Sequence, residues 1–234
     1  MRNYSKLFTE LLLKIQDESM DFCITGFNCL YFISYLRKQM QGALPGRNSH
    51  LRMIPHIRQA EFPHDPESGI KSSVLLLLYP ENGNIFTVLI RRPVYEGVHS
   101  GQIALPGGKY KDDDVNLMQT ALREAKEEVG IHPGDVEIIG SLTDLLIPPS
   151  RFLLTPFLGF SLQKPGFKPN PDEVAEIIEV DIREISDKNL KEKDIAVYGG
   201  KIFKTPYYDI HNQVVWGATG MILSEFSELT KKYW

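Results

Sequence analysis

The chain has 234 residues, of which 42% are hydrophobic and 24% charged, and its formal net charge is −4. These are ordinary values for a globular protein that buries a core in one large domain, or in one domain with a helical extension. The negative net charge and the lack of a long basic run argue against a nucleic-acid polymer as the main partner, because such binding needs clustered Lys and Arg. We therefore expect a small-molecule partner.

The two cysteines, Cys23 and Cys29, cannot form a disulfide framework. Their spacing, with no further Cys or nearby His, is not a zinc pattern. We expect buried or idle thiols.

The N-terminal region to about residue 41 is predicted to be helical, with an apolar stripe formed by Leu7, Leu11, Leu12 and Ile15. Residues 22–36 are strongly apolar but too short to span a bilayer comfortably. Acidic residues precede this stretch, which argues against a signal peptide. A packed helix or a homodimer contact is expected here, with peripheral membrane association as the lesser alternative. We accordingly expect a cytoplasmic protein without a transmembrane segment.

Residues 43–58 are interrupted by Pro45, Gly46 and Pro55, which predicts an extended connector. Its basic residues could reach substrate phosphates, although a solvated linker explains each of them singly: Arg47, His50, Arg52 and Arg58. We place a domain boundary here, with a helical extension over residues 1–42 and the main domain over residues 43–234.

Residues 73–79 form a continuous apolar run of strand length, residues 81–84 are a turn, and residues 85–91 return as a second strand. Further strands are predicted at 136–141, 153–159, 177–180, 195–197, 202–203 and 207–210. One long helix interrupts this series, and a second helix over about 218–231 closes it. The pattern predicts an α/β fold, an α/β/α sandwich with a mixed β-sheet.

The long helix lies within residues 107–131. Its apolar side chains recur at the helical spacing of one buried stripe: Met118, Ala121, Leu122, Ala125 and Val129. Asp113, Asp114 or Asn116 can cap its start, and Gly130 can adopt the left-handed conformation that ends a helix.

The polar face of this helix violates local preferences. Glu124, Glu127 and Glu128 share one face in the last turn, where the helix dipole is already negative. A divalent cation would turn this repulsion into ligation. Arg123 could orient Glu127 by a charge-assisted hydrogen bond. The plainer alternative is an ordinary solvated helix face.

The segment REAKEEVGI, preceded by LPGGK, resembles the Nudix box of enzymes that hydrolyse a nucleoside diphosphate linked to another group. The residues that match its second half are Arg123, Glu124, Ala125, Glu127, Glu128, Gly130 and Ile131. The first half departs from the family pattern. Asp114 stands where the pattern has glutamate, and the stretch from Asp114 to Arg123 is one residue longer.

The resemblance implies the Nudix fold and a catalytic set of Arg123, Glu124, Glu127 and Glu128. It also implies that Mg²⁺ or Mn²⁺ is held by the three glutamates and the Gly107 carbonyl. A further carboxylate can take the proton of the attacking water. Glu173 is our candidate for that general base, and Glu124 is the competitor.

A second signature lies just upstream. Residues 89–109, LIRRPVYEGVHSGQIALPGGK, resemble the segment that marks the coenzyme A diphosphatase branch of the family. The matching residues are Arg91, His99, Gly101, Gln102, Pro106, Gly107 and Gly108. Gly97 stands where the branch generally has Arg. Weaker matches extend the resemblance over about residues 43–230.

This second resemblance implies metal-dependent hydrolysis of coenzyme A or its thioesters to 3′,5′-ADP and (acyl-)4′-phosphopantetheine. Its expected substrate-binding residues are Arg91, His99, Gln102, Gly107 and Gly108. Two alternatives stay open. One is a Nudix diphosphatase for ADP-ribose, a dinucleotide or another nucleoside diphosphate derivative. The other is a catalytically silent Nudix domain that senses a nucleotide; such domains typically lose box carboxylates, and this chain keeps all three.

Overall fold

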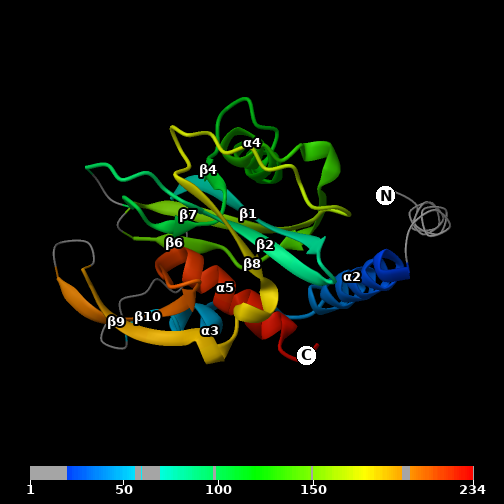
Figure 1. Cartoon of the computed structure of the whole chain (residues 1–234). Helices are drawn as coiled ribbons and strands as arrows, with labels where there is room; N and C mark the ends of the chain where they lie inside the picture. The colour runs from blue at the N-terminus through cyan, green and yellow to red at the C-terminus, as the bar shows by residue number, and fades with distance from the viewer. Residues whose placement is uncertain are drawn as a thin grey trace.

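The computed structural model describes residues 20–55, 59, 69–96, 99–148, 150–196 and 201–233, and for residues 20–28 and 196 only the backbone. A central β-sheet lies between two helical layers (Figure 1). The helix α4 (Leu117–Val129) covers one face. The other face carries α5 (Gly217–Thr230), with α2 (Met20–Gln39) and α3 (Gly46–Leu51) on the same side. The predicted α/β/α sandwich is therefore confirmed.

The predicted hairpin is formed by β1 (Ile70–Glu81) and β2 (Asn84–Arg91), which pair antiparallel. Its turn residues Asn82 and Gly83 have φ of 47° and 81°. Asn and Gly adopt this left-handed conformation most readily, which explains why the turn forms at this dipeptide.

The larger sheet has the order β3-β2-β1-β7-β5, with β4 on β1, β6 on β7 and β8 on β2. The pairing of β1 with β7 is parallel and the others are antiparallel, so the sheet is mixed as predicted. The remaining strands are β3 (Ile103–Ala104), β4 (Gly107–Lys109), β5 (Glu137–Ser141), β6 (Leu145–Ile147), β7 (Phe152–Phe160) and β8 (Glu176–Asp181).

The apolar run of β1 is explained by burial on both faces of the sheet. Leu75 and Leu77 pack in the core beneath α4, while Leu76 and Leu78 pack in the opposite core beneath α5. All four side chains have no exposed surface. A strand covered on both sides has no alternation of polar and apolar residues, as this sequence shows.

Helix α4 begins and ends as the sequence predicts. The side chain of Asn116 accepts a hydrogen bond from the Gln119 N–H at 2.9 Å, and Gly130 has φ of 77°. Of the predicted stripe, Ala121, Ala125 and Val129 are fully buried and Leu122 is half-buried. The prediction was wrong for Met118, which is 38% exposed because the first turn of α4 borders an open cavity.

The apolar N-terminal segment is a packed helix over the residues whose side chains are described. Cys29, Phe32, Ile33 and Leu36 lie in the same core as α5. Burial raises the pKa of the Cys29 thiol to about 12, so this thiol is inert at neutral pH. The predicted stripe of Leu7 to Ile15 lies outside the described residues. None of the described helices has the length and apolar character needed to cross a membrane.

The extended connector predicted for residues 43–58 is wrong over α3. Pro45 already has the helical φ of −58°, and the buried Glu225 carboxylate accepts the Gly46 N–H at 3.2 Å. Because a backbone N–H at the start of the helix has a hydrogen-bond acceptor, the helix forms despite Pro45 and Gly46. Two of the four basic residues are engaged within the fold: His50 is buried against Glu225, and Arg52 pairs with Asp187 and Glu228. Arg58 lies outside the described residues.

A second sheet of order β11-β10-β9 contains β9 (Leu190–Ala196), β10 (Ile202–Ile210) and β11 (Gln213–Val215). The two short strands predicted at 202–203 and 207–210 are one strand, β10. Short 3-10 helices lie at Pro133–Asp135, Ile182–Glu184 and Asp187–Asn189. The two- and three-residue strands β3, β4, β6 and β11 were not predicted, because such short segments carry no period.

Candidate active site

Strand β4 brings the two glycines of the LPGGK segment against β1. Gly107 pairs with Val74, and a Cβ on Gly107 would lie 2.3 Å from the Ser73 carbonyl oxygen. Its φ of 158° adds strain for any other residue. Gly107 is therefore required for β4 to pair with β1.

Gly108 serves a different purpose. A Cβ on Gly108 would lie 2.5 Å from the Glu124 carboxyl carbon. Strand β4 thus lies directly against this carboxylate, and the missing side chain makes room for it. The Glu124 side chain is only 12% exposed.

Glu128 is the most deeply buried carboxylate of α4, with 4% of its surface exposed. Its Oε2 atom accepts the Gly107 N–H at 2.8 Å. Burial raises the pKa of Glu128 to about 7; the Gly107 bond and the charge of Arg92 oppose the rise, and the charges of Glu124 and Glu173 add to it. A buried carboxylate is costly to ionise unless positive charge or hydrogen-bond donors compensate it.

Arg123 is fixed by Asp114, the residue that departs from the family pattern. The guanidinium donates from Nε to Oδ1 at 2.8 Å and from Nη2 to Oδ2 at 2.9 Å. Thr120 and the Lys111 N–H donate to the same carboxylate. The hydrogen bonds from Arg123 hold the pKa of Asp114 well below its usual range. Asp114 therefore anchors Arg123 despite the additional residue in the loop.

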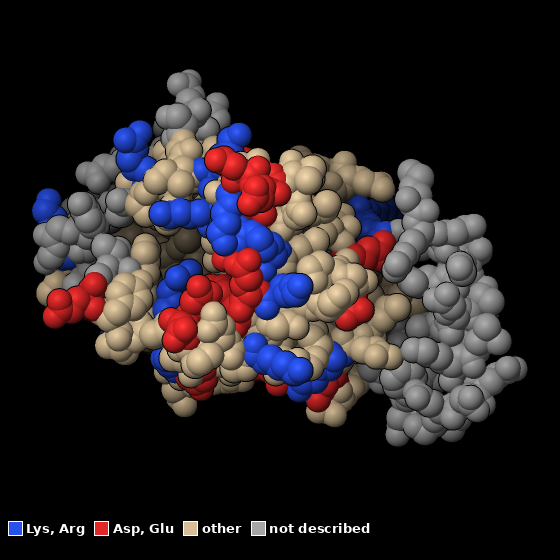
Figure 2. Space-filling view, turned by 90° about the horizontal axis from the view of Figure 1, so that it is seen from above, with Lys and Arg blue, Asp and Glu red and all other residues tan. Residues whose placement is uncertain are grey.

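The anchored guanidinium also reaches the glutamates. Arg123 Nη1 donates to Glu124 at 2.6 Å and to Glu127 at 3.0 Å, and Lys111 approaches Glu127 at 3.3 Å. Figure 2, which looks onto the side of α4, shows acidic and basic side chains gathered together on this face. Within the described parts of the chain, no three His, Cys, Asp or Glu side chains are grouped closely enough to hold an ion.

The chemistry of this donor set nevertheless fits a hard divalent cation. Glu124 lies against Gly108 of β4, and Glu128 accepts the N–H of Gly107 in the same strand. Glu127 is 44% exposed and lies one turn from Arg123. Oxygen donors with an excess of negative charge are what Mg²⁺ and Mn²⁺ select. Burial is the main cause of the raised pKa of Glu128, and the charges of Glu124 and Glu173 add to it.

The loop before β8 brings Glu173 toward α4. The Lys168 N–H donates to the Val129 carbonyl at 2.9 Å, and the Asn170 N–H donates to the Glu128 carbonyl at 2.8 Å. Glu173 itself is exposed, and its negative charge contributes to the raised pKa of Glu128. The structure thus brings Glu173 to the same region as the Nudix-box glutamates.

The two adjacent arginines at the end of β2 have different surroundings. Arg91 forms an ion pair with Glu176 at 2.8 Å, and both side chains are partly exposed. Arg92 was not predicted as a site residue, but its charge lowers the pKa of Glu128. The sequence signal that could have found it is the Arg-Arg pair itself, since neighbouring residues near a strand end point to opposite sides.

The loop from Arg92 to Gln102 is closed by backbone bonds. The Arg92 N–H donates to the Gln102 carbonyl at 3.0 Å, and His99 Nδ1 lies 3.0 Å from Gln102 Oε1. His99 has φ of 75°. The structure therefore brings His99, Gln102 and Arg92 together in one loop that leads into β3 and β4.

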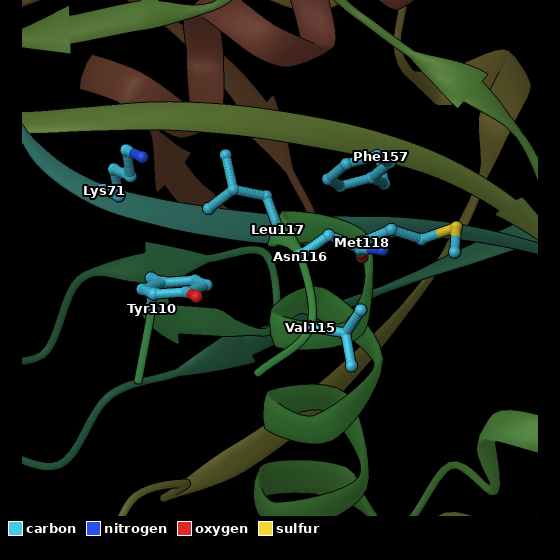
Figure 3. A pocket seen from close by; sticks show the side chains of 7 residues that line it. All are labelled: Lys71, Tyr110, Val115, Asn116, Leu117, Met118 and Phe157. Carbon is cyan, nitrogen blue, oxygen red and sulfur yellow. The ribbon is translucent and has the colours of Figure 1, made fainter. Parts of the chain in front are cut away.

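A cavity of about 550 Å³ lies elsewhere, at the opposite end of α4 from Glu128 (Figure 3). Its lining residues in the described chain are Lys71, Tyr110, Val115, Asn116, Leu117, Met118 and Phe157. None of them is a predicted site residue, and the lining contains a single charged side chain. With one charged side chain, this cavity is a poorer candidate for binding an anionic ligand than the face of α4 that carries the glutamates.

Comparison with known proteins identifies the family of this chain. The model of the NUDIX domain matches residues 69–198. Nudix hydrolase 15, mitochondrial, of Arabidopsis thaliana is 31% identical over 170 residues, which cover 68% of this chain and 58% of that protein. The Nudix hydrolase NudL of Pectobacterium atrosepticum is 34% identical over 152 residues, covering 60% of this chain and 72% of that protein.

The chain therefore spans less than two thirds of the length of the Arabidopsis relative. Among solved structures, the Nudix hydrolase RenU of M. smegmatis has a TM-score of 0.49 at 17% identity, covering 69% of this chain and 86% of that chain. The family model covers more than half of the sequence and includes β4, α4 and the loop that carries Glu173. The chain therefore belongs to the NUDIX family.

Proposed function

We propose that this protein cleaves the diphosphate bond of coenzyme A or its thioesters, giving 3′,5′-ADP and (acyl-)4′-phosphopantetheine. Membership of the family supports hydrolysis of a nucleoside diphosphate derivative. The narrower proposal rests on one observation. The upstream segment with the coenzyme A signature forms a closed loop at which Arg92 lies near enough to influence Glu128.

The metal site in this proposal consists of Glu124, Glu127 and Glu128 with the Gly107 carbonyl. Bound Mg²⁺ or Mn²⁺ neutralises the diphosphate oxygens and makes the attacking water more acidic. Asp114 would keep Arg123 in place if the glutamates held a cation, because its two hydrogen bonds to Arg123 do not involve the glutamates. Arg123 then acts as a fixed positive charge beside the ligands.

Glu173 takes the proton of the attacking water in this scheme. It belongs to a loop outside α4 and its charge influences Glu128, so in this proposal it can act on the water without leaving a ligand position vacant. Glu124 remains the competitor for this role. His99, Gln102 and the arginines at the end of β2 contact the parts of the substrate that do not react.

The test is turnover of a substrate panel by purified protein, with Mg²⁺ and Mn²⁺ supplied in turn and the products identified by mass. The panel contains coenzyme A, an acyl-coenzyme A, ADP-ribose and NADH. We expect the highest kcat/KM for the coenzyme A compounds, with 3′,5′-ADP as a product. A preference for ADP-ribose or NADH would favour the other Nudix diphosphatase activity, and no turnover of any compound would favour a nucleotide sensor.

The matched variant is Glu128→Gln, which keeps the shape of the side chain and removes its charge. We expect turnover to be abolished while the far-UV circular dichroism spectrum is retained, because a ligand is lost but the Gly107 N–H keeps an acceptor. Turnover at the wild-type rate would mean that the metal site lies elsewhere.

Three further expectations accompany the proposal. A cytoplasmic location stays a prediction, and the name of the Arabidopsis relative assigns that protein to mitochondria. The homodimer contact through residues 22–36 also stays a prediction. So does the division of the chain into an extension over residues 1–42 and a domain over residues 43–234.

A further inference from the structure

We propose that Asn170 is a positioning residue that holds Glu173 opposite Glu128. This inference rests on the proposed function, because it assigns Asn170 a purpose in the reaction through Glu173. The loop that carries Glu173 is hydrogen-bonded to the backbone of Glu128, so the conformation of this loop decides where the Glu173 side chain lies. Glu173 is exposed and free to swing away unless its backbone is held.

The backbone of Asn170 forms hydrogen bonds both to α4, which precedes it in the chain, and to the residues that follow it. Its N–H donates to the Glu128 carbonyl at 2.8 Å, which ties the loop to the last turn of α4. Its carbonyl accepts the Glu173 N–H at 3.1 Å and the Val174 N–H at 2.8 Å. A single residue thus connects the backbone of Glu128 with the backbone of Glu173.

The side chain of Asn170 closes the turn between these contacts. Its Oδ1 atom accepts the Asp172 N–H at 3.2 Å, the local bond of an Asx turn. This bond bends the chain so that the Asn170 carbonyl faces Glu173 and Val174. Without it, the turn has more conformations available.

The loop has separate anchors that carry its stability. Val174 is 3% exposed and packs in the core beneath α4. Phe167 packs edge-on against Tyr79, with ring centroids 5.5 Å apart. Because these anchors do not involve the Asn170 side chain, its loss should change the direction of Glu173 more than the stability of the fold.

The test is a double-mutant cycle in kcat, with Asn170→Ala and Glu173→Gln made singly and together. A lost local cap costs about 1 kcal/mol, so we expect Asn170→Ala to lower kcat about fivefold with little change in KM. In the Glu173→Gln background the same substitution should have no further effect, since its action passes through Glu173. Asn170→Asp keeps the acceptor and should restore the wild-type rate.

Asp172→Ala is the matched control, because it removes an exposed side chain from the same turn but keeps the N–H that Asn170 accepts. Its kcat should equal that of the wild type. An equal fall in kcat from Asn170→Ala in both backgrounds would overturn the proposal, as would a wild-type rate for Asn170→Ala. Wild-type turnover of the substrate panel tests the proposed function first. The cycle is run on whichever compound of the panel the wild type hydrolyses, so the two proposals can fail independently.

Discussion

Asp114 is 4% exposed, and Arg123, Thr120 and the Lys111 backbone all donate hydrogen bonds to it. From the sequence alone it was only a possible helix cap and a departure from the family pattern. Asn116 is the cap instead. The loop can be one residue longer than in the family pattern because the Asp114 carboxylate still reaches Arg123. This contact depends on the conformation of the loop, which cannot be predicted from residue spacing.

Asp114→Asn should lower the free energy of unfolding by about 1–3 kcal/mol at pH 7, because it weakens charge-assisted hydrogen bonds to Arg123. Arg123 depresses the pKa of Asp114 in the folded protein. The ionised carboxylate therefore stabilises the fold above its ordinary pKa, and this stabilisation is lost as the pH falls toward the folded-state value. Urea denaturation between pH 7 and pH 3 should show the difference between the two proteins shrinking below about pH 4.

The control is Asp113→Asn, at the exposed neighbour of Asp114. It should leave the free energy of unfolding unchanged within about 0.5 kcal/mol. A difference between Asp114→Asn and wild type that grows as the pH falls would contradict the sign argued for Asp114.

Arg92 should contribute more to catalysis than Arg91. Arg91 is already paired with Glu176, whereas Arg92 acts on Glu128. We expect Arg92→Ala to lower kcat/KM for coenzyme A. The loss should correspond to about 1–3 kcal/mol of transition-state stabilisation, the typical contribution of a hydrogen bond to a charged group. Arg91→Ala should cost less, and steady-state kinetics on coenzyme A and ADP-ribose measures both.

Gln102→Ala is the companion variant, because Gln102 contacts His99 in the same loop. It should reduce the rate on coenzyme A more than any slow activity on ADP-ribose, since remote contacts raise the rate only for the substrate that makes them. Equal losses on both substrates from Arg92→Ala and Gln102→Ala would mean that these residues support the metal site or the fold.

Among the helices and strands, those with a periodic pattern of apolar residues or clear cap and turn residues could be predicted from the sequence. Helix α4 and the hairpin of β1 and β2 carry their period, caps and turn residues in the sequence. Strand β4 has the sequence GGK, which has no strand pattern, and it exists because Ser73 and Val74 offer pairing partners. Helix α3 follows Pro45 and begins with Gly46, and the N–H of Gly46 donates to Glu225, which lies far along the chain. Contacts of this kind cannot be read from a local pattern.

The close packing of β4 on α4 gives a prediction for Gly108→Ala. The added methyl would meet the carboxyl end of Glu124, a flexible group that can move, so the fold should lose less than about 1 kcal/mol. The displaced Glu124 would be a poor ligand, and kcat/KM should fall at least about tenfold because small misplacements are costly in catalysis. Urea denaturation and steady-state kinetics on the same preparation separate the two effects.

Two glycines provide the comparison for Gly108→Ala. A Cβ on Gly166 would meet nothing within 4 Å, so Gly166→Ala should affect neither stability nor rate. Gly107→Ala should instead destabilise the protein, because its Cβ would lie 2.3 Å from backbone. Full activity of Gly108→Ala would show that catalysis does not require Glu124 in the position seen in the structure.

At the scale of the whole molecule, a buried polar network ties the helical layer to the sheet. Glu225 of α5 has no exposed surface and accepts hydrogen bonds from His50, Thr143 and the Gly46 N–H. Burial pushes the pKa of Glu225 up, but the bonds from His50 and Thr143 outweigh it and leave the pKa below its usual value. The chain before β1 is thus fastened to the last helix by a satisfied buried charge.

Helix α2 is fastened to the same layer by apolar contacts. Phe32 has no exposed surface, and its ring packs edge-on against Tyr233 at a centroid distance of 4.7 Å. Cys29, Ile33 and Leu36 lie in the same core as α5. The described part of the N-terminal extension therefore shares a core with the domain, and we expect the two to unfold together.

Phe32→Ala tests this expectation. Removing a fully buried aromatic side chain should lower the free energy of unfolding by about 3–5 kcal/mol, through lost burial and the cavity left behind. If α2 and the sheet share one core, this loss of stability applies to the whole protein, which then unfolds in a single transition. The midpoint of urea denaturation should fall by the same amount whether it is followed by far-UV circular dichroism or by enzymatic activity. Tyr31→Ala, on the same helix but 72% exposed, should change the midpoint little. An extension that unfolds separately would give a different result: Phe32→Ala would produce an early partial loss of helical signal while activity kept its wild-type midpoint.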